Sequence, residues 1–375
     1  MTPVELSRTV LRAMRRAVDD GELSALDDAS DVDMTRRVVV ERPRPGGSGD
    51  YATNVALQVA RAAGRTPLQV AEVLSPRLAR EPGIAAIDIT GPGFLNITLD
   101  RGGSQGRAGS LSAALVHDVL TRGDRYGHAR PGSGGTGGTG DSEARHLHVA
   151  REVRAAVLAD SLRRILISQG APAQNVRITC DEAPDPGWDA LGVQVDGHGR
   201  PPASVSTLRP VPAPADPTFL GRDAARWALL HPAAHDRPRI SEEHLLQRAG
   251  NPLFRVRYAH SRTRALTRNA AALGFAGAPG DVAGTAETAA RELLDALADH
   301  PRVLAAADHH RAPDRLARHL VVTADAFLAF QPAVLPPGDE KPSAAHRARL
   351  ALAEAAGTVL AGGLSLLGIS APEYL

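Results

Sequence analysis

The chain has 375 residues, which is enough for two or three domains, each with its own core. It carries 43 lysine and arginine residues against 42 aspartate and glutamate residues. The net charge of +1 excludes a globally basic protein, so any nucleic-acid surface must be a local patch. A single cysteine, Cys180, excludes a disulfide framework and a cysteine-rich zinc site.

The sequence also argues against a membrane protein. No uncharged run approaches the length of a membrane span, and the first residues carry Glu5 and four arginines on a helical pattern, unlike a secretion signal. We therefore expect no membrane partner and a cytoplasmic location.

Residues 1–130 have the pattern of a compact α+β domain. Helices are predicted over residues 6–18, 54–63 and 67–80. Strands are predicted over residues 38–40, 84–89 and 94–99. The last two strands flank Gly91-Pro92-Gly93, which indicates a hairpin.

A glycine-rich run at residues 131–140 has no side chains that pack, so it is predicted to be a flexible linker. Residues 141–210 then predict one strand-helix-strand, with an amphipathic helix that ends near Gly170 and a strand at 176–180. The prolines and glycines between residues 181 and 204 predict a loop or one short hairpin. Carboxylates occur here, but no partner histidine or carboxylate spacing supports a metal site; they are Asp181, Glu182 and Asp185.

Residues 215–375 predict an all-α bundle. Asn251 is a good N-cap, and Pro252 suits the first helical position. Later helices fit residues 286–299, 312–330 and 344–367. Pro301 and the run Pro336-Pro337-Gly338 are expected to separate them.

Three collinear blocks resemble arginyl-tRNA synthetases. The run NPLFRVRYAHSR at residues 251–262 and the ending LSLLGISAPEYL resemble the DALR anticodon-binding domain of that family. GDYATN at 49–54 and GPGFLN at 91–96 resemble its amino-terminal additional domain. The resemblance implies an α+β amino-terminal domain, a vestigial α/β (Rossmann-like) remnant and an all-α DALR bundle.

The block at residues 141–182 is similar to the opening of a class I synthetase core, with changes at the positions that carry chemistry. In the family element Leu-His-Val-Gly-His, the first histidine is kept as His148, while Ala150 replaces the glycine and Arg151 the second histidine. The second family signature, Lys-Met-Ser-Thr-Arg, has a degenerate match at residues 204–208. Ser204 stands in place of its lysine, and Ser206 lies two residues later. These losses remove close backbone approach to the nucleotide and a cation for the leaving pyrophosphate.

The short length of this block also argues against a nucleotide-binding core. A doubly wound nucleotide fold needs several βαβ units of about thirty residues or more each, and residues 181–204 hold less than one. We therefore predict no catalytic residue, no metal and no cofactor, with ATP bound only if residual ligase activity survives.

The resemblance implies two tRNA contacts. Phe94 and Asn96 are predicted at the tRNA elbow, where an aromatic stacks on a base and an amide reads a base edge. The residues predicted at the anticodon loop are Arg255, Tyr258, His260, Arg262, Phe327, Phe330, Tyr374 and Leu375. Each has an ordinary alternative: the aromatics and His260 as packed residues, Asn96 as a polar strand position, and the arginines as a solvated helix face.

Three functions follow from these patterns. The first is a non-catalytic, monomeric paralogue of arginyl-tRNA synthetase that holds tRNA, arginine-accepting or related. The second is residual arginine–tRNA ligase activity, which the short core opposes. The third is an interaction module that binds a protein, such as a true synthetase.

Overall fold

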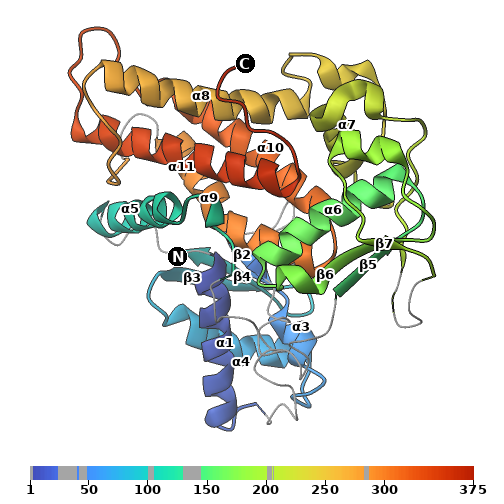
Figure 1. The fold of residues 1–375 in the computed structure, drawn as a ribbon. Coiled ribbons are helices and arrows are strands. Elements are labelled where there is room, and N and C mark those ends of the chain that lie inside the picture. Colours follow the sequence, from blue (N-terminus) through green and yellow to red (C-terminus); the bar gives the residue numbers. More distant parts are fainter. Residues whose placement is uncertain are drawn as a thin grey trace. The chain divides into compact units, whose positions relative to one another are not determined.

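The computed structural model describes residues 3–23, 40–41, 49–99, 105–129, 145–200, 205, 207–282 and 287–375 (Figure 1). Three predictions lie outside these residues: the linker at 131–140, the strand positions 38–39, and Ser204 with Ser206. The described chain divides into two compact units, the first ending at Leu111 and the second beginning at Ser112.

The first unit is built on an antiparallel sheet with the strand order β1-β2-β4-β3. Its strands are β1 (Val40–Glu41), β2 (Tyr51–Thr53), β3 (Ile84–Thr90) and β4 (Phe94–Leu99). Its helices are α1 (Pro3–Asp19), α3 (Val55–Val59) and α4 (Pro67–Ala79). The predicted helices and the hairpin are confirmed because each buries the apolar face that its spacing marked, as Leu6, Val10 and Met14 do in α1.

The second unit begins earlier than the predicted boundary at residue 130. Helix α5 (Gln105–Arg122) was not predicted, and a 3-10 turn follows it at Gly123–Arg125. Val116, Val119 and Tyr126 join the core of the second unit, and the Tyr126 hydroxyl donates a 3.0 Å hydrogen bond to the Leu297 carbonyl.

Four parallel strands form the sheet of the second unit, in the order β7-β6-β5-β8. Strand β5 (Arg145–Val149), helix α6 (Val153–Ser168) and strand β6 (Val176–Cys180) confirm the predicted strand-helix-strand. Beyond them, a 3-10 helix covers Pro186–Leu191 and two short strands are β7 (Gly197–His198) and β8 (Thr207–Leu208).

The alternative of a short hairpin within residues 181–204 is wrong, because β7 pairs with β6 in parallel. Asp196 fixes the chain beside β6 just before β7 begins. Its amide donates to the Ile178 carbonyl at 2.8 Å, and its carboxylate accepts from the Ile178 amide at 2.7 Å. The chain is thereby held in parallel alongside β6.

Helices form the rest of the second unit: α7 (Gly221–Leu230), α8 (Pro252–Ala272), α9 (Glu287–His309), α10 (Pro313–Phe330) and α11 (Ala344–Leu366). Figure 1 shows α8, α10 and α11 packed against one another. The Asn251 cap is confirmed, since its side chain accepts from the amides of Leu253 and Phe254. The expected break at Pro301 is wrong: Pro301 lies inside α9, where buried Leu297 and Leu304 on either side hold the helix against the core.

The parallel sheet and the bundle lie in one compact unit and share one core. Two buried arginines join them. Arg226 donates to Asp160 at 2.7 Å and to the carbonyls of Leu367 and Leu191. Arg154 donates to the carbonyls of Leu229, Val211, Asp236, Pro232 and Ala233.

No helix within the described residues is long and apolar enough to cross a membrane.

Candidate nucleic-acid interface

The outer face of α8 gathers most of the residues predicted to contact the anticodon loop. Val256, Ala259, Thr263 and Leu266 are buried and fix α8 on the bundle. The opposite face is consequently directed outward, and it carries aromatic and arginine side chains.

Two stacked aromatic rings form the centre of this face. Phe254 and Tyr258 lie one turn apart, and their ring centroids are 5.5 Å apart with an interplanar angle of 20°. Both side chains are half-buried, so each is supported by the helix and still presents a surface. A stacked ring of this kind is a platform for an unpaired base.

Arginines lie on both flanks of this aromatic pair. On the flank toward α10, which we call the α10 flank, Arg255 pairs with Asp325 at 3.4 Å and Arg262 donates to Gln331 Oε1 at 3.3 Å. On the other flank, which we call the carboxy-terminal flank, lie Arg257, Arg264 and Arg268. The Asp325 carboxylate is at the surface, so its pairing with Arg255 contributes little to stability.

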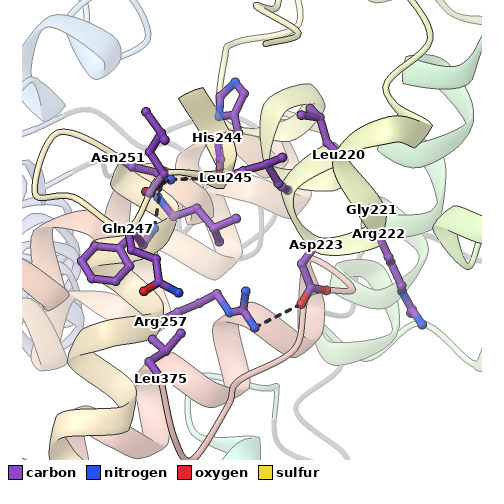
Figure 2. Close-up of a pocket in the computed structure, with 14 residues that line it drawn as sticks. Leu220, Gly221, Arg222, Asp223, His244, Leu245, Gln247, Asn251, Arg257 and Leu375 are labelled. Atoms are coloured by element: carbon purple, nitrogen blue, oxygen red, sulfur yellow. Dashed lines mark hydrogen bonds and ion pairs between the residues drawn. The ribbon is translucent and has the colours of Figure 1, made fainter. Parts of the chain in front are cut away.

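A cavity of about 460 Å³ opens beside the start of α8 (Figure 2). Apolar side chains from three segments line it, including Leu220, Leu245 and Leu253. Figure 2 shows Arg257 directed toward Asp223, with the two charged groups 3.6 Å apart, and Leu375 beside Arg257. Polar and charged side chains, among them Arg222 and Gln247, line the rest of the cavity. Apolar side chains with placed polar groups are found together in many small-molecule sites.

Asn251 determines the shape of this cavity. Its side-chain carbonyl caps α8, while its amide nitrogen donates to the carbonyls of His244 and Leu246 at 2.9 Å each. One buried side chain therefore fixes both the start of the helix and the loop that forms the facing wall.

The structure corrects four of the predicted tRNA contacts, Phe327, Phe330, Asn96 and His260, and the last of these is only 6% exposed. Phe327 and Phe330 have no exposed surface and belong to the bundle core, so neither offers a face to a base. Asn96 is 5% exposed, and its amide donates to Thr90 Oγ1 at 2.7 Å, so it is not free to read a base edge. In each case the ordinary packing alternative is the correct one.

Phe94 and His260 differ in exposure. Phe94, in the first unit, is 40% exposed at the start of β4. His260 is buried, and its Nδ1 lies 2.9 Å from the Pro372 carbonyl; burial lowers its pKa, so the neutral ring donates there. Tyr374 and Leu375 are exposed.

Two residues that were predicted to be remnants of a nucleotide site, His148 and Arg151, lie at the carboxyl edge of the parallel sheet. His148 is fully buried, with Nδ1 2.8 Å from Thr179 Oγ1 and Nε2 2.8 Å from Asp181 Oδ1. Arg151 is exposed and lies 3.8 Å from Asp185. In the described part of the chain, no three histidine, cysteine or acidic side chains are grouped to hold a metal ion.

Glu152 occupies the amino terminus of α6, a feature that the sequence analysis missed. Its carboxylate accepts from the amides of Arg154 at 3.0 Å, Ala155 at 2.8 Å and Ala213 at 2.9 Å. The Arg154 and Ala155 amides are donors of the kind that a helix amino terminus offers to a phosphate, whereas the Ala213 amide comes from a separate segment. The available signal was an acidic residue just before a helical pattern.

Comparisons with known proteins agree with this architecture. A model of the DALR anticodon binding domain matches residues 256–375, and a model of the arginyl-tRNA synthetase N-terminal domain matches residues 18–99. The arginine–tRNA ligases of Frankia alni and Paenarthrobacter aurescens are 29% and 27% identical over 567 and 553 residues, covering all of both chains. Because this chain has 375 residues, these alignments contain long gaps in it.

Solved structures show the same fold. The arginyl-tRNA synthetase of Thermus thermophilus superimposes with a TM-score of 0.62 at 14% identity, covering all of both chains. The enzyme of Plasmodium falciparum gives 0.63 at 9% identity, covering 100% of this chain and 99% of the other. The chain therefore carries the N-terminal and DALR domains of arginyl-tRNA synthetases and is homologous over its length to arginine–tRNA ligases, although it is much shorter than they are.

Proposed function

We propose that the protein is a non-catalytic tRNA-binding paralogue of arginyl-tRNA synthetase. The observation that carries the proposal is the outer face of α8, where the Phe254–Tyr258 stack lies between arginine flanks and beside a cavity with mixed apolar and polar walls. This combination suits an RNA loop, because unpaired bases stack on aromatic rings and the phosphates pair with arginines.

In this proposal the cavity takes one base of the loop while Tyr258 stacks on another. Arg255 exchanges its surface ion pair with Asp325 for a phosphate, which costs little because such pairs are weak. Arg262 exchanges its hydrogen bond to the neutral Gln331 amide for a phosphate. Phe94, exposed in the first unit, supplies a second contact at the tRNA elbow.

The absence of catalysis in this proposal rests on Glu152. A nucleotide phosphate at the start of α6 needs the amides that the Glu152 carboxylate already engages, and it would meet a like charge there. The neighbouring cavity of about 570 Å³ adds the carboxylates of Asp185 and Asp216 to its lining. Among the described residues of that lining Arg151 is the one cation, so this lining does not fit a triphosphate.

Binding of total tRNA to the purified chain tests the proposal. Tyr258→Ala should weaken binding about 5- to 150-fold, since a lost base stack costs about 1 to 3 kcal/mol. Arg262→Gln should weaken binding and reduce the salt slope by about one unit, because one phosphate contact is lost. Arg291→Gln is the matched control, since Arg291 is an exposed helix arginine whose 2.7 Å partner, Glu287, lies on its own helix.

Circular dichroism must first show that each variant is folded. If the folded variants bind tRNA as the parent does, the proposed face is not the RNA site. If the parent binds no tRNA, the alternative of a protein-interaction module is favoured instead.

A further inference from the structure

The carboxy-terminal flank of α8 is covered by the chain's own residues 370–375. Arg257 Nη2 lies 3.4 Å from Ser370 Oγ, and the Arg264 guanidinium lies 2.9 Å from the Glu373 carboxylate. The Arg268 guanidinium lies 4.3 Å from the centre of the Tyr374 ring. Successive turns of α8 thus each contact this segment, which we call the 370–375 segment.

The segment is held at its start by a defined set of bonds. The Ser370 amide donates to Asp223 Oδ1 at 3.1 Å, and the Ser370 hydroxyl donates to the other oxygen of that carboxylate. His260 donates to the Pro372 carbonyl. The segment therefore has a specific docked position and is not merely adjacent to the helix.

The chemistry of these contacts resembles that of bound RNA. Glu373 places a carboxylate on Arg264 as a phosphate would, and Tyr374 places a ring over Arg268 as a base would. Leu375 lines the cavity beside Arg257. The segment thus binds Arg264 by charge and Arg268 by stacking. Its Leu375 also narrows the cavity that is proposed to bind a base.

The contacts are also weak enough to be exchanged. Tyr374 is 71% exposed, and the side chains of Arg264 and Glu373 are about half exposed. Exposed ion pairs and cation–π contacts each contribute little in water, whereas a tRNA loop offers several phosphates at once. The docked segment and a bound tRNA cannot both use the same guanidinium face.

We propose that the 370–375 segment is an intramolecular competitor of tRNA on the carboxy-terminal flank of α8. It shields Arg257, Arg264 and Arg268 in the free protein and leaves them when tRNA binds. This inference rests on the proposed function and adds regulation of the same site. It also gives Tyr374 and Leu375 the opposite effect to a direct tRNA contact, because their removal strengthens binding.

The test compares Glu373→Gln and Tyr374→Ala with the parent, using total tRNA and, separately, inorganic polyphosphate as probes. Glu373→Gln should bind both probes about two- to tenfold more tightly, because Arg264 loses its intramolecular carboxylate. Tyr374→Ala should also bind tRNA more tightly. Glu287→Gln is the control, since that exposed carboxylate pairs with an arginine on α9 and should leave both affinities unchanged.

Hydrogen exchange gives an independent measurement of the segment itself. The Ser370 amide is protected by Asp223 in the free protein, so its peptide should exchange faster when tRNA is bound. Slower exchange on binding would mean that the segment is part of the interface and would overturn the inference.

The outcomes separate the inference from the proposed function. If Glu373→Gln and Tyr374→Ala bind tRNA no more tightly than the parent, the inference fails while tRNA binding stands. If tRNA binds to no variant but polyphosphate binding tightens in Glu373→Gln, the proposed function fails while the segment still shields an anion site. If neither probe binds, both are wrong.

Discussion

His300 on α9 and His319 on α10 form a buried pair whose ring centroids are 5.3 Å apart. His300 also stacks on Tyr126 at 5.9 Å, and no described residue accepts from or donates to its buried Nδ1. Burial lowers the pKa of His319 to about 4 and that of His300 well below its usual value, with His128, Asp299 and Arg302 as the nearby titratable or charged groups. Both rings are neutral at pH 7.

This pair predicts a loss of stability in mild acid. Between pH 6.5 and pH 4 the unfolded state binds more protons than the folded state, so the free energy of unfolding falls as the pH falls. His319 alone should remove about 1.5 kcal/mol between pH 6.5 and pH 5. Urea denaturation at pH 6.5 and at pH 5 measures this change in the free energy of unfolding. His319→Gln should reduce the pH dependence, whereas His309→Gln, at an exposed position, should not. Equal pH dependence in the parent and His319→Gln would contradict the assignment.

At the scale of elements, one ion pair joins the parallel sheet to the bundle. Asp160 on α6 is 2% exposed; burial would raise its pKa, but Arg226 and Arg164 hold it below the usual value. Arg226 on α7 also donates to the Leu367 carbonyl at the end of α11. Gly368 allows this approach: its φ is +71°, and a Cβ there would lie 2.5 Å from the Arg226 guanidinium.

Removing the charge of Asp160 should therefore destabilise the whole second unit. Asp160→Asn leaves Arg226 buried without a counter-charge, and we expect a loss of about 3 to 5 kcal/mol in the free energy of unfolding. Asp118→Asn is the matched control, because its ion pair with Arg122 is exposed and should change stability by less than about 0.5 kcal/mol. A cost as small as that of the control would show that the pair does not hold the sheet to the bundle.

The same elements show what the sequence can predict. Spacing predicted α1, α4, α6, α10 and α11 because each helix buries the stripe that the pattern marks. The helix break predicted at Pro301 does not occur, because the packing of α9 against α10 outweighs the local preference of proline. Phe327 and Phe330 were misplaced for a related reason: an aromatic on an amphipathic helix has the same pattern whether it faces the core or a ligand.

The candidate site was only partly predictable. Tyr258, Arg255 and Arg262 lie on the outer face of α8, where helical spacing places them. The cavity, the Glu152 cap and the docked 370–375 segment join residues far apart in the sequence, such as Arg264 with Glu373 and Glu152 with Ala213. Spacing within one segment contains no information about such contacts.

At the scale of the whole molecule, the chain carries the N-terminal and DALR domains of arginyl-tRNA synthetases and is much shorter than the arginine–tRNA ligases that it matches. It has 375 residues, whereas the alignments with the Frankia and Paenarthrobacter ligases span more than 550. The described parallel sheet has four strands, and β7 and β8 contain two residues each. The small size of this described sheet supports the proposal that the chain lacks ligase chemistry.

The last prediction is that the purified chain does not catalyse arginine-dependent ATP–pyrophosphate exchange. Restoring the family residues with Ala150→Gly and Arg151→His should not create exchange, because Glu152 still occupies the α6 amino terminus. The assay needs a preparation free of host synthetase, and Arg151→Ala controls for this, since exchange by a contaminant is unchanged by substitutions in this chain. Arginine-dependent exchange that is lost or altered in Arg151→Ala would instead belong to this chain, and the residual-ligase alternative would replace the proposed function.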